Sequence, residues 1–237
     1  MVKLHLSRLA MPKAWPFKRK GIKFIVRPKS SRPMRDSLPI LLIVREMLGY
    51  VKTAREAKKV LNNKDVLVNK KIVKDPKLSV GLMDIIEFPK LKTQFRVLLN
   101  KQGKFKLQPI EAKDTGLKPS KILSKNILKG KKIQINLDDG KNILIKENNY
   151  KVGDTLLIDL EKNEIKEHLP LEKSATIYLT SGKKMGFIGT VESIKQFSGV
   201  QEDNIIFNHK GKSEETKKKY ALVIGKNKAA INIEENE

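Results

Sequence analysis

Few side chains in this sequence are of the types that perform covalent or metal chemistry. There is no cysteine, so thiol nucleophiles, thiolate metal ligands and disulfide bonds are excluded, as suits a reducing compartment. Beyond residue 88 the histidines are His168 and His209, and neither has a spacing typical of metal ligands. We therefore expect no metal, no cofactor and no small-molecule substrate.

Two other patterns resemble catalytic motifs but are incomplete. Gly211-Lys212-Ser213 matches the end of a Walker A loop, which needs a glycine five residues before Gly211, where Ile206 stands instead. Asp138-Asp139 offers paired carboxylates, but Gly140 follows directly, and Asp before Gly is typical of a turn. We therefore predict that the chain is not an enzyme.

The chemistry that the composition favours is neutralisation of phosphates. The 237 residues include 50 Lys and Arg against 26 Asp and Glu, a formal net charge of +24 that far exceeds what solubility requires. The expected partner is therefore a polyanion, and composition by itself does not distinguish RNA from DNA. The longest apolar run, Leu38 to Val44, is far shorter than the roughly 20 residues of a membrane span, so we expect no membrane partner.

The first 36 residues concentrate this charge. Eleven Lys and Arg precede Asp36, the first acid, and four interleaved prolines exclude one long helix. We predict an extended basic arm over residues 1–36, in which aromatic side chains either stack on bases or pin the arm to its own domain. The candidate RNA-binding residues of this arm are Lys3, Arg8, Lys13, Trp15, Lys18, Arg19 and Lys20.

Residues 37–90 alternate helical and strand patterns. Leu41, Val44 and Leu48 form one apolar stripe, which predicts a helix that begins at Ser37. Thr53, with Glu56 three residues later, forms a capping box that opens a second helix. Short strands are expected within 66–73 and 84–88.

The TAREA start of the second helix, the following VLVNK turn and the late DII strand resemble the RNA-binding domain named after bacterial small-subunit ribosomal protein S-four. The resemblance covers residues 37–88. It implies that the start of the second helix and the turn after the next strand face RNA together. The residues of this sequence at those places are Lys52, Arg55, Lys59, Lys64, Asn69, Lys70 and Lys71.

The rest of the chain reads as β structure. Residues 91–170 alternate apolar and polar side chains around Asp139-Gly140, which predicts a small sheet or barrel whose function the sequence leaves open. Residues 171–237 contain a glycine-rich basic turn between two β stretches, and this resembles a KOW motif on an SH3-like barrel. The resemblance implies RNA contacts from Lys183 and Lys184. The expected fold class is α+β with several domains.

The order of basic arm, S-four-type domain, β middle and KOW motif is similar to the archaeal and eukaryotic small-subunit ribosomal protein family S-four-E, and the length favours an archaeal member. This resemblance implies a cytoplasmic structural constituent of the small ribosomal subunit, which supports translation by binding ribosomal RNA and contacts neighbouring ribosomal proteins. The alternative is a free RNA-binding factor in transcription elongation or ribosome biogenesis, since KOW barrels also occur in such factors.

Overall fold

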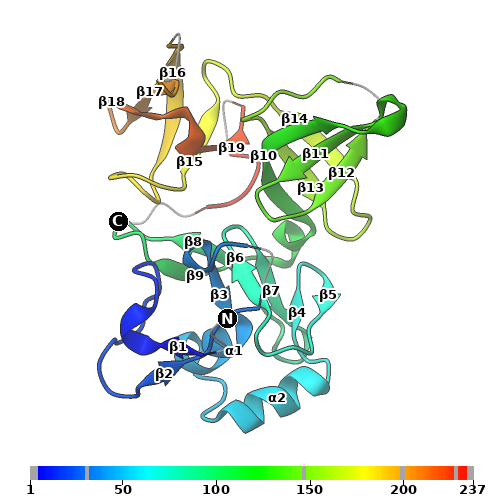
Figure 1. Cartoon of the computed structure of the whole chain (residues 1–237), viewed down its shortest axis with the longest axis vertical. Helices are drawn as coiled ribbons and strands as arrows, with labels where there is room; N and C mark the ends of the chain where they lie inside the picture. The colour runs from blue at the N-terminus through cyan, green and yellow to red at the C-terminus, as the bar shows by residue number, and fades with distance from the viewer. Residues whose placement is uncertain (1–4, 30–31, 146–147, 198–200, 227–228, 234–237) are drawn as a thin grey trace. The chain divides into compact units, whose positions relative to one another are not determined.

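The computed structural model describes residues 5–29, 32–145, 148–197, 201–226 and 229–233 (Figure 1). The chain divides into two compact units, Met1–Thr115 (unit 1) and Gly116–Glu237 (unit 2), and each is described by itself. The described chain is mostly β with few helices. None of the helices found in the described ranges combines the length and apolar character that a membrane span needs.

The first helix of unit 1 begins later than the apolar stripe predicts. Ser37–Pro39 form strand β3, which pairs with β6 (Ser79–Gly81), so their backbone groups are committed to a sheet. Helix α1 (Ile40–Leu42) follows and continues as a π-helical turn, Ile43–Met47. Gly49 ends this segment in the left-handed region with φ 68°, where glycine has no steric penalty.

Helix α2 (Ala54–Asn62) confirms the predicted capping box. Thr53 Oγ1 accepts a hydrogen bond from the Glu56 backbone N–H at 3.2 Å, and a Glu56 carboxylate oxygen accepts one from the Thr53 N–H at 3.3 Å. Ala57 and Leu61 are buried on the inner face of the helix. The opposite face, which carries the basic side chains, is exposed.

A five-stranded antiparallel sheet with the order β5-β4-β7-β8-β9 forms the body of unit 1. Its strands are β4 (Leu67–Val68), β5 (Lys71–Ile72), β7 (Ile85–Phe88), β8 (Thr93–Leu99) and β9 (Phe105–Pro109). The domain boundary expected at residues 90 and 91 lies inside this sheet. The short connection Pro89–Leu91 with Lys92 at φ 52° returns the chain so that Phe88 pairs with Thr93.

The N-terminal segment is folded onto unit 1 rather than extended. Strands β1 (Leu6–Ser7) and β2 (Phe24–Ile25) pair with each other. Trp15 is 2% exposed, and its indole N–H donates to the Ser37 carbonyl at 2.9 Å. This burial agrees with the alternative that an aromatic side chain pins the segment to its own domain, and it corrects the expectation of an extended arm. The prolines exclude a long helix without preventing the segment from packing on its neighbours.

Unit 2 contains two five-stranded antiparallel sheets. The first has the order β12-β11-β10-β13-β14 and consists of β10 (Leu117–Ile127), β11 (Ile133–Leu137), β12 (Asn142–Ile145), β13 (Thr155–Asp159) and β14 (Ile165–Leu169). The second has the order β18-β17-β16-β15-β19 and consists of β15 (Thr176–Leu179), β16 (Ile188–Lys195), β17 (Asn204–His209), β18 (Lys212–Lys217) and β19 (Ala221–Gly225). The boundary expected at 170 and 171 lies within this compact unit.

A buried lysine connects the two sheets of unit 2. Lys121 on β10 is 7% exposed, and its Nζ donates to the carbonyls of Lys218, Lys219 and Ala221 at 3.2, 2.8 and 2.6 Å. Three carbonyl acceptors suit the three N–H donors of an ammonium group. Burial nevertheless lowers the pKa of Lys121 to about 8, because desolvation disfavours its charged form.

We expect the stability of unit 2 to depend on this titration. Between pH 8 and 10.5 the unfolded chain keeps the Lys121 proton that the folded chain releases, so the free energy of unfolding rises with pH, by roughly 3 kcal/mol at most from this group. Denaturant unfolding of the native protein and Lys121→Met across this range measures the effect. A pH-independent difference between the two proteins would contradict it.

Candidate nucleic-acid interface

Helix α2 and its ends present a basic surface on unit 1, which we call the helix surface. Its members are the exposed residues Lys52, Arg55, Lys59 and Lys64. Arg55 and Lys59 stand one turn apart and therefore share a face. The acid among them, Glu56, is engaged by the Lys52 and Thr53 backbone N–H groups, and these hydrogen bonds lower its pKa. Glu56 therefore stays ionised, and the helix surface is positive because its four cations outnumber this one carboxylate.

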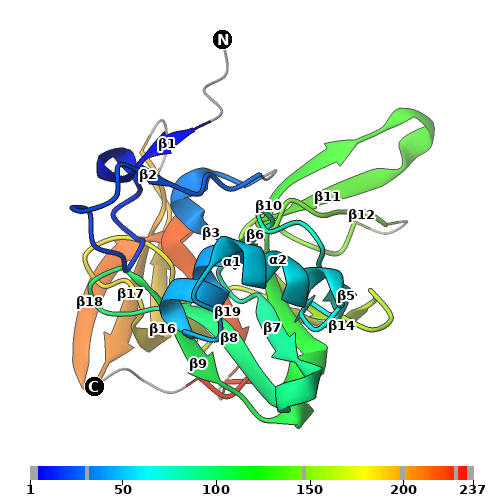
Figure 2. The same ribbon diagram turned by 90° about the horizontal axis from the view of Figure 1, so that it is seen from below.

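The predicted turn residues Asn69, Lys70 and Lys71 divide into two kinds. Lys71 is exposed and belongs to β5, and this strand lies close to the C-terminal end of α2 in both views (Figures 1 and 2), so Lys71 extends the helix surface. Lys70 instead forms an ion pair with Glu87 at 3.0 Å, and a 3.2 Å contact joins its Nζ to Thr115 Oγ1. Its charge is already compensated, so Lys70 contributes to the fold rather than to an RNA-facing charge.

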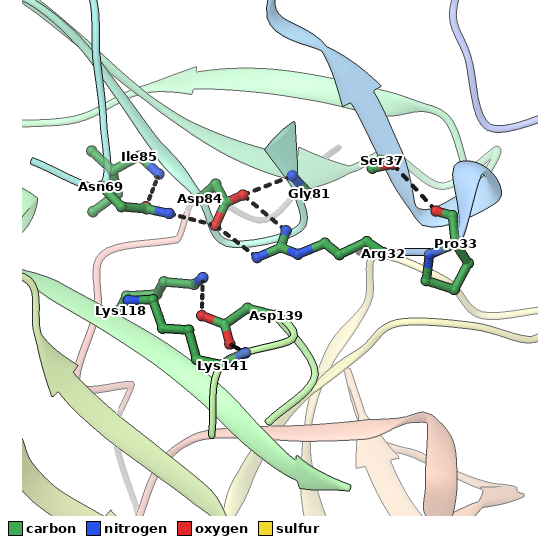
Figure 3. Close-up of polar contacts among 10 residues, drawn as sticks. All are labelled: Arg32, Pro33, Ser37, Asn69, Gly81, Asp84, Ile85, Lys118, Asp139 and Lys141. Atoms are coloured by element: carbon green, nitrogen blue, oxygen red, sulfur yellow. Dashed lines mark hydrogen bonds and ion pairs between the residues drawn. The ribbon is translucent and has the colours of Figure 1, made fainter. Parts of the chain in front are cut away.

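Asn69 has a structural role at a centre formed around the buried carboxylate of Asp84 (Figure 3). Asp84 is 2% exposed and accepts hydrogen bonds from Asn69 Nδ2 at 2.9 Å and from the Gly81 N–H at 2.7 Å. Arg32 completes the centre with an ion pair to Asp84 at 2.8 Å. Asn69 Oδ1 also accepts from the Ile85 N–H at 3.0 Å, which fixes the turn that carries Lys71.

The basic residues of the N-terminal segment likewise differ in exposure: some are exposed, and others are engaged within the fold. Lys13, Lys18 and Lys20 are exposed. Arg8 is buried, forms an ion pair with Glu46 at 2.9 Å and donates to the Lys18 carbonyl at 2.6 Å. The half-buried Arg19 donates to the Leu9 carbonyl at 2.8 Å.

Two predicted RNA contacts of this segment are corrected by the structure. Trp15, buried against Ser37, cannot stack on a base, so its expected RNA contact is replaced by a packing role. Arg8 is likewise committed to Glu46. Lys3 lies outside the described residues.

On unit 2, the predicted basic loop lies beside a second turn, which the sequence alone does not associate with RNA binding. Lys183 is exposed, and Lys184 forms an ion pair with Glu214 at 2.6 Å. The Lys184 ammonium also lies 5.5 Å from the centre of the Phe187 ring. Phe187 in turn stacks on His209, with ring centroids 4.6 Å apart and an interplanar angle of 6°.

The stacked His209 leads directly into the β17–β18 turn, whose Lys210 and Lys212 are exposed. Its Nδ1 lies 2.6 Å from the Ile188 carbonyl on β16, which fixes the ring. The loop and this turn therefore form one surface, the loop–turn surface, made of Lys183, Lys184, Phe187, His209, Lys210 and Lys212. From the sequence we consider His209 only as a possible metal ligand, since nothing in the sequence near it indicates the strand pairing that brings it to Phe187.

Gly189, in the segment that resembles a KOW motif, is needed for the packing of two strands of the second sheet. A Cβ at this position would lie 2.7 Å from the Asn208 carbonyl oxygen and 2.7 Å from the Phe207 ring, so only glycine lets β16 approach β17 this closely. This glycine is therefore required by the pairing of β16 with β17.

The remaining candidate chemical groups have structural roles. Asp139 lies in the β11–β12 turn, as predicted, and forms a buried ion pair with Lys118 at 2.8 Å (Figure 3). His168 Nε2 lies 2.7 Å from Asp154 Oδ2, whose other oxygen accepts from the Leu171 N–H. Gly211 belongs to a β-turn rather than to the start of a helix. Across the described ranges, no group of three or more acidic or histidine side chains is arranged to hold a metal ion.

The centre around Asp84 predicts a large loss of stability on neutralisation. Asp84→Asn removes the ion pair with Arg32, whose charge is then left without its buried partner, and we expect about 3 kcal/mol of destabilisation. Asp36→Asn is the matched control, because the Asp36 pair with Arg35 is exposed and should contribute less than about 1 kcal/mol. Denaturant unfolding measures both. Equal effects of the two variants would refute the proposed role of Asp84.

Family models match two stretches of the chain. The model described as Ribosomal family S4e matches residues 91–165, and the S4 domain matches residues 42–86. The S4 match includes α2, strand β4 and the first half of strand β7, which carry or support the helix surface. The predicted S-four-type domain is therefore confirmed.

Relatives match over almost the full length. The small ribosomal subunit protein eS4 of Methanocaldococcus jannaschii is 42% identical over 241 residues, covering 98% of each chain, and that of Methanopyrus kandleri is 35% identical over 252 residues, covering 99% of this chain and 97% of the relative. The crystal structure of the 30S ribosomal protein S4e from Thermoplasma acidophilum has a TM-score of 0.70 and 29% identity, covering 80% of this chain and 95% of that one. By these matches the chain belongs to the ribosomal protein family S4e, as its sequence resemblance predicted.

Proposed function

We propose that the protein is a structural constituent of the small ribosomal subunit that binds ribosomal RNA through the helix surface of unit 1 and the loop–turn surface of unit 2. The family is one of ribosomal structural proteins, and the expectation that the chain is no enzyme is confirmed by this membership. The curated relatives are themselves named as small-subunit proteins. We also propose that this protein works in the cytoplasm, on the ribosome, beside other ribosomal proteins.

One observation carries the proposal. The helix surface and Lys71 place five exposed cations around one short helix, while Glu56 is held by backbone N–H groups. When these side chains neutralise RNA phosphates, the counterions condensed on the RNA are released. This release contributes a large share of the binding free energy. Exposed Lys13, Lys18 and Lys20 would add contacts of the same kind.

The loop–turn surface supports a second mode of contact. Its stacked Phe187 and His209 rings lie on a surface that also carries the exposed Lys183 and Lys212, whereas the charge of Lys184 is compensated by Glu214. Aromatic rings beside exposed cations suit an unpaired base next to a phosphate. We propose that the sheet formed by β15–β19 is the expected KOW barrel and that this surface is its RNA-binding loop. Support comes from the glycine-rich connection between β15 and β16, where Gly182 and Gly186 have φ of 96° and 79°.

The salt dependence of binding tests the helix surface. We expect the triple variant Arg55→Glu, Lys59→Glu and Lys71→Glu to bind small-subunit ribosomal RNA more weakly, with the slope of log affinity against log salt reduced by about 0.9 for each duplex phosphate that the protein no longer neutralises. The matched control reverses three exposed lysines elsewhere on unit 1, Lys77, Lys101 and Lys104. If the slope of the first variant equals that of the native protein, the helix surface is not the binding surface.

Sedimentation of cell lysate separates this proposal from a free RNA-binding factor. We expect the protein to co-sediment with small subunits in a sucrose gradient, because contacts distributed over two surfaces dissociate slowly. A protein that stays at the top of the gradient while small subunits sediment normally would favour the free factor.

A further inference from the structure

The β10–β11 hairpin of unit 2 projects beyond the sheet to which it belongs. Strand β10 pairs with β13 from Leu117 to Lys121, and from Ile122 to Ile127 it pairs with β11. In the part of the chain that the structure describes, the far half of β10 therefore has a strand on one side only. Figure 2 shows the hairpin, in green, extending past the neighbouring strands.

The charge of this hairpin is of one sign. Residues 115–137 contain six lysines and no acid. Two of the six are buried and serve the fold, Lys118 with Asp139 and Lys121 with backbone carbonyls. The other four belong to the projecting part, namely Lys125, Lys129, Lys131 and Lys132, and Lys129 and Lys132 are exposed.

One face of the hairpin is lined with amides and a hydroxyl. Gln134 Nε2 donates to Asn136 Oδ1 at 2.7 Å, and Asn136 Nδ2 donates to Ser124 Oγ at 2.9 Å. Asn126 pairs directly with Gln134 across the strands and is exposed. Asn, Gln and Ser side chains are common donors to phosphate and ribose oxygens.

Two exposed apolar side chains of this region, Ile127 on β10 and Leu144 on the neighbouring β12, do not share a face. Ile127 is 81% exposed and pairs with Ile133, whereas Leu144 is 60% exposed and pairs with Gln134, the next residue along β11. Because successive residues of a strand point to opposite faces, Ile127 and Leu144 lie on opposite faces. A protein-docking surface would be expected to gather such side chains into one patch.

We infer that the β10–β11 hairpin is an additional RNA-binding element, which inserts its lysine-rich turn and amide face against the backbone of folded ribosomal RNA. The inference rests on the proposed function. A competing explanation is that the lysines protect the open edge of β10 from pairing with another chain. Glutamates would provide the same protection, so charge reversal separates the two explanations.

The test compares two full-length variants with the same change in net charge. The turn variant carries Lys129→Glu, Lys131→Glu and Lys132→Glu, and the control carries Lys162→Glu, Lys166→Glu and Lys173→Glu at exposed positions elsewhere in unit 2. The probe is small-subunit ribosomal RNA, and the quantity measured is the slope of log affinity against log salt concentration. We expect the magnitude of this slope to decrease by about 2 to 3 for the turn variant and by less than about 1 for the control. Thermal unfolding of each variant verifies that the fold is kept.

Each outcome decides the inference. A native protein that does not bind the RNA defeats the proposed function, and this inference with it. Native binding with an unchanged slope for the turn variant, or an equal reduction in both variants, overturns the hairpin inference alone. A photo-cross-linking amino acid at Asn126, in protein assembled into small subunits, gives an independent result. Cross-links to RNA support the inference, and cross-links to a ribosomal protein overturn it.

Discussion

The buried carboxylate of Asp84 is the interaction on which the arrangement of unit 1 depends. It accepts hydrogen bonds from a backbone N–H, from Asn69 and from Arg32, which come from separate segments of the chain. Burying an ionised carboxylate is unfavourable unless it is paired and hydrogen-bonded, so these partners are needed together. The centre thereby fixes the turn after β4 and attaches the end of the N-terminal segment to the S4 domain.

The same constraint divides the basic residues of this protein into two groups. Arg8, Lys70, Lys118 and Lys121 are matched to carboxylates or carbonyls and stabilise the fold. The exposed lysines and arginines of the helix surface, the loop–turn surface and the β10–β11 hairpin form the other group. On the proposed function, a net charge of +24 is tolerable in such a chain because an RNA partner would neutralise the second group, while the first is already compensated inside each unit.

Local signals in the sequence predicted local structure well. The capping box at Thr53 and Glu56, the short strands of residues 66–73 and the turn at Asp139-Gly140 were all confirmed, since each depends on neighbouring residues. Contacts between residues far apart in the sequence were not predicted. The burial of Trp15 against Ser37 and the stacking of His209 on Phe187 involve segments brought together only by the fold. For the same reason, the number of lysines did not reveal which of them are available to bind RNA.

Cross-linking of native small subunits, with sequencing of the bound RNA and mapping of the linked peptides, tests the central claim most directly. We predict cross-links in a few helices of small-subunit ribosomal RNA, and peptides from residues 52–71 and from the loop–turn surface. Cross-links scattered over nascent transcripts or transfer RNA, or peptides that leave out both surfaces, would contradict the proposed function.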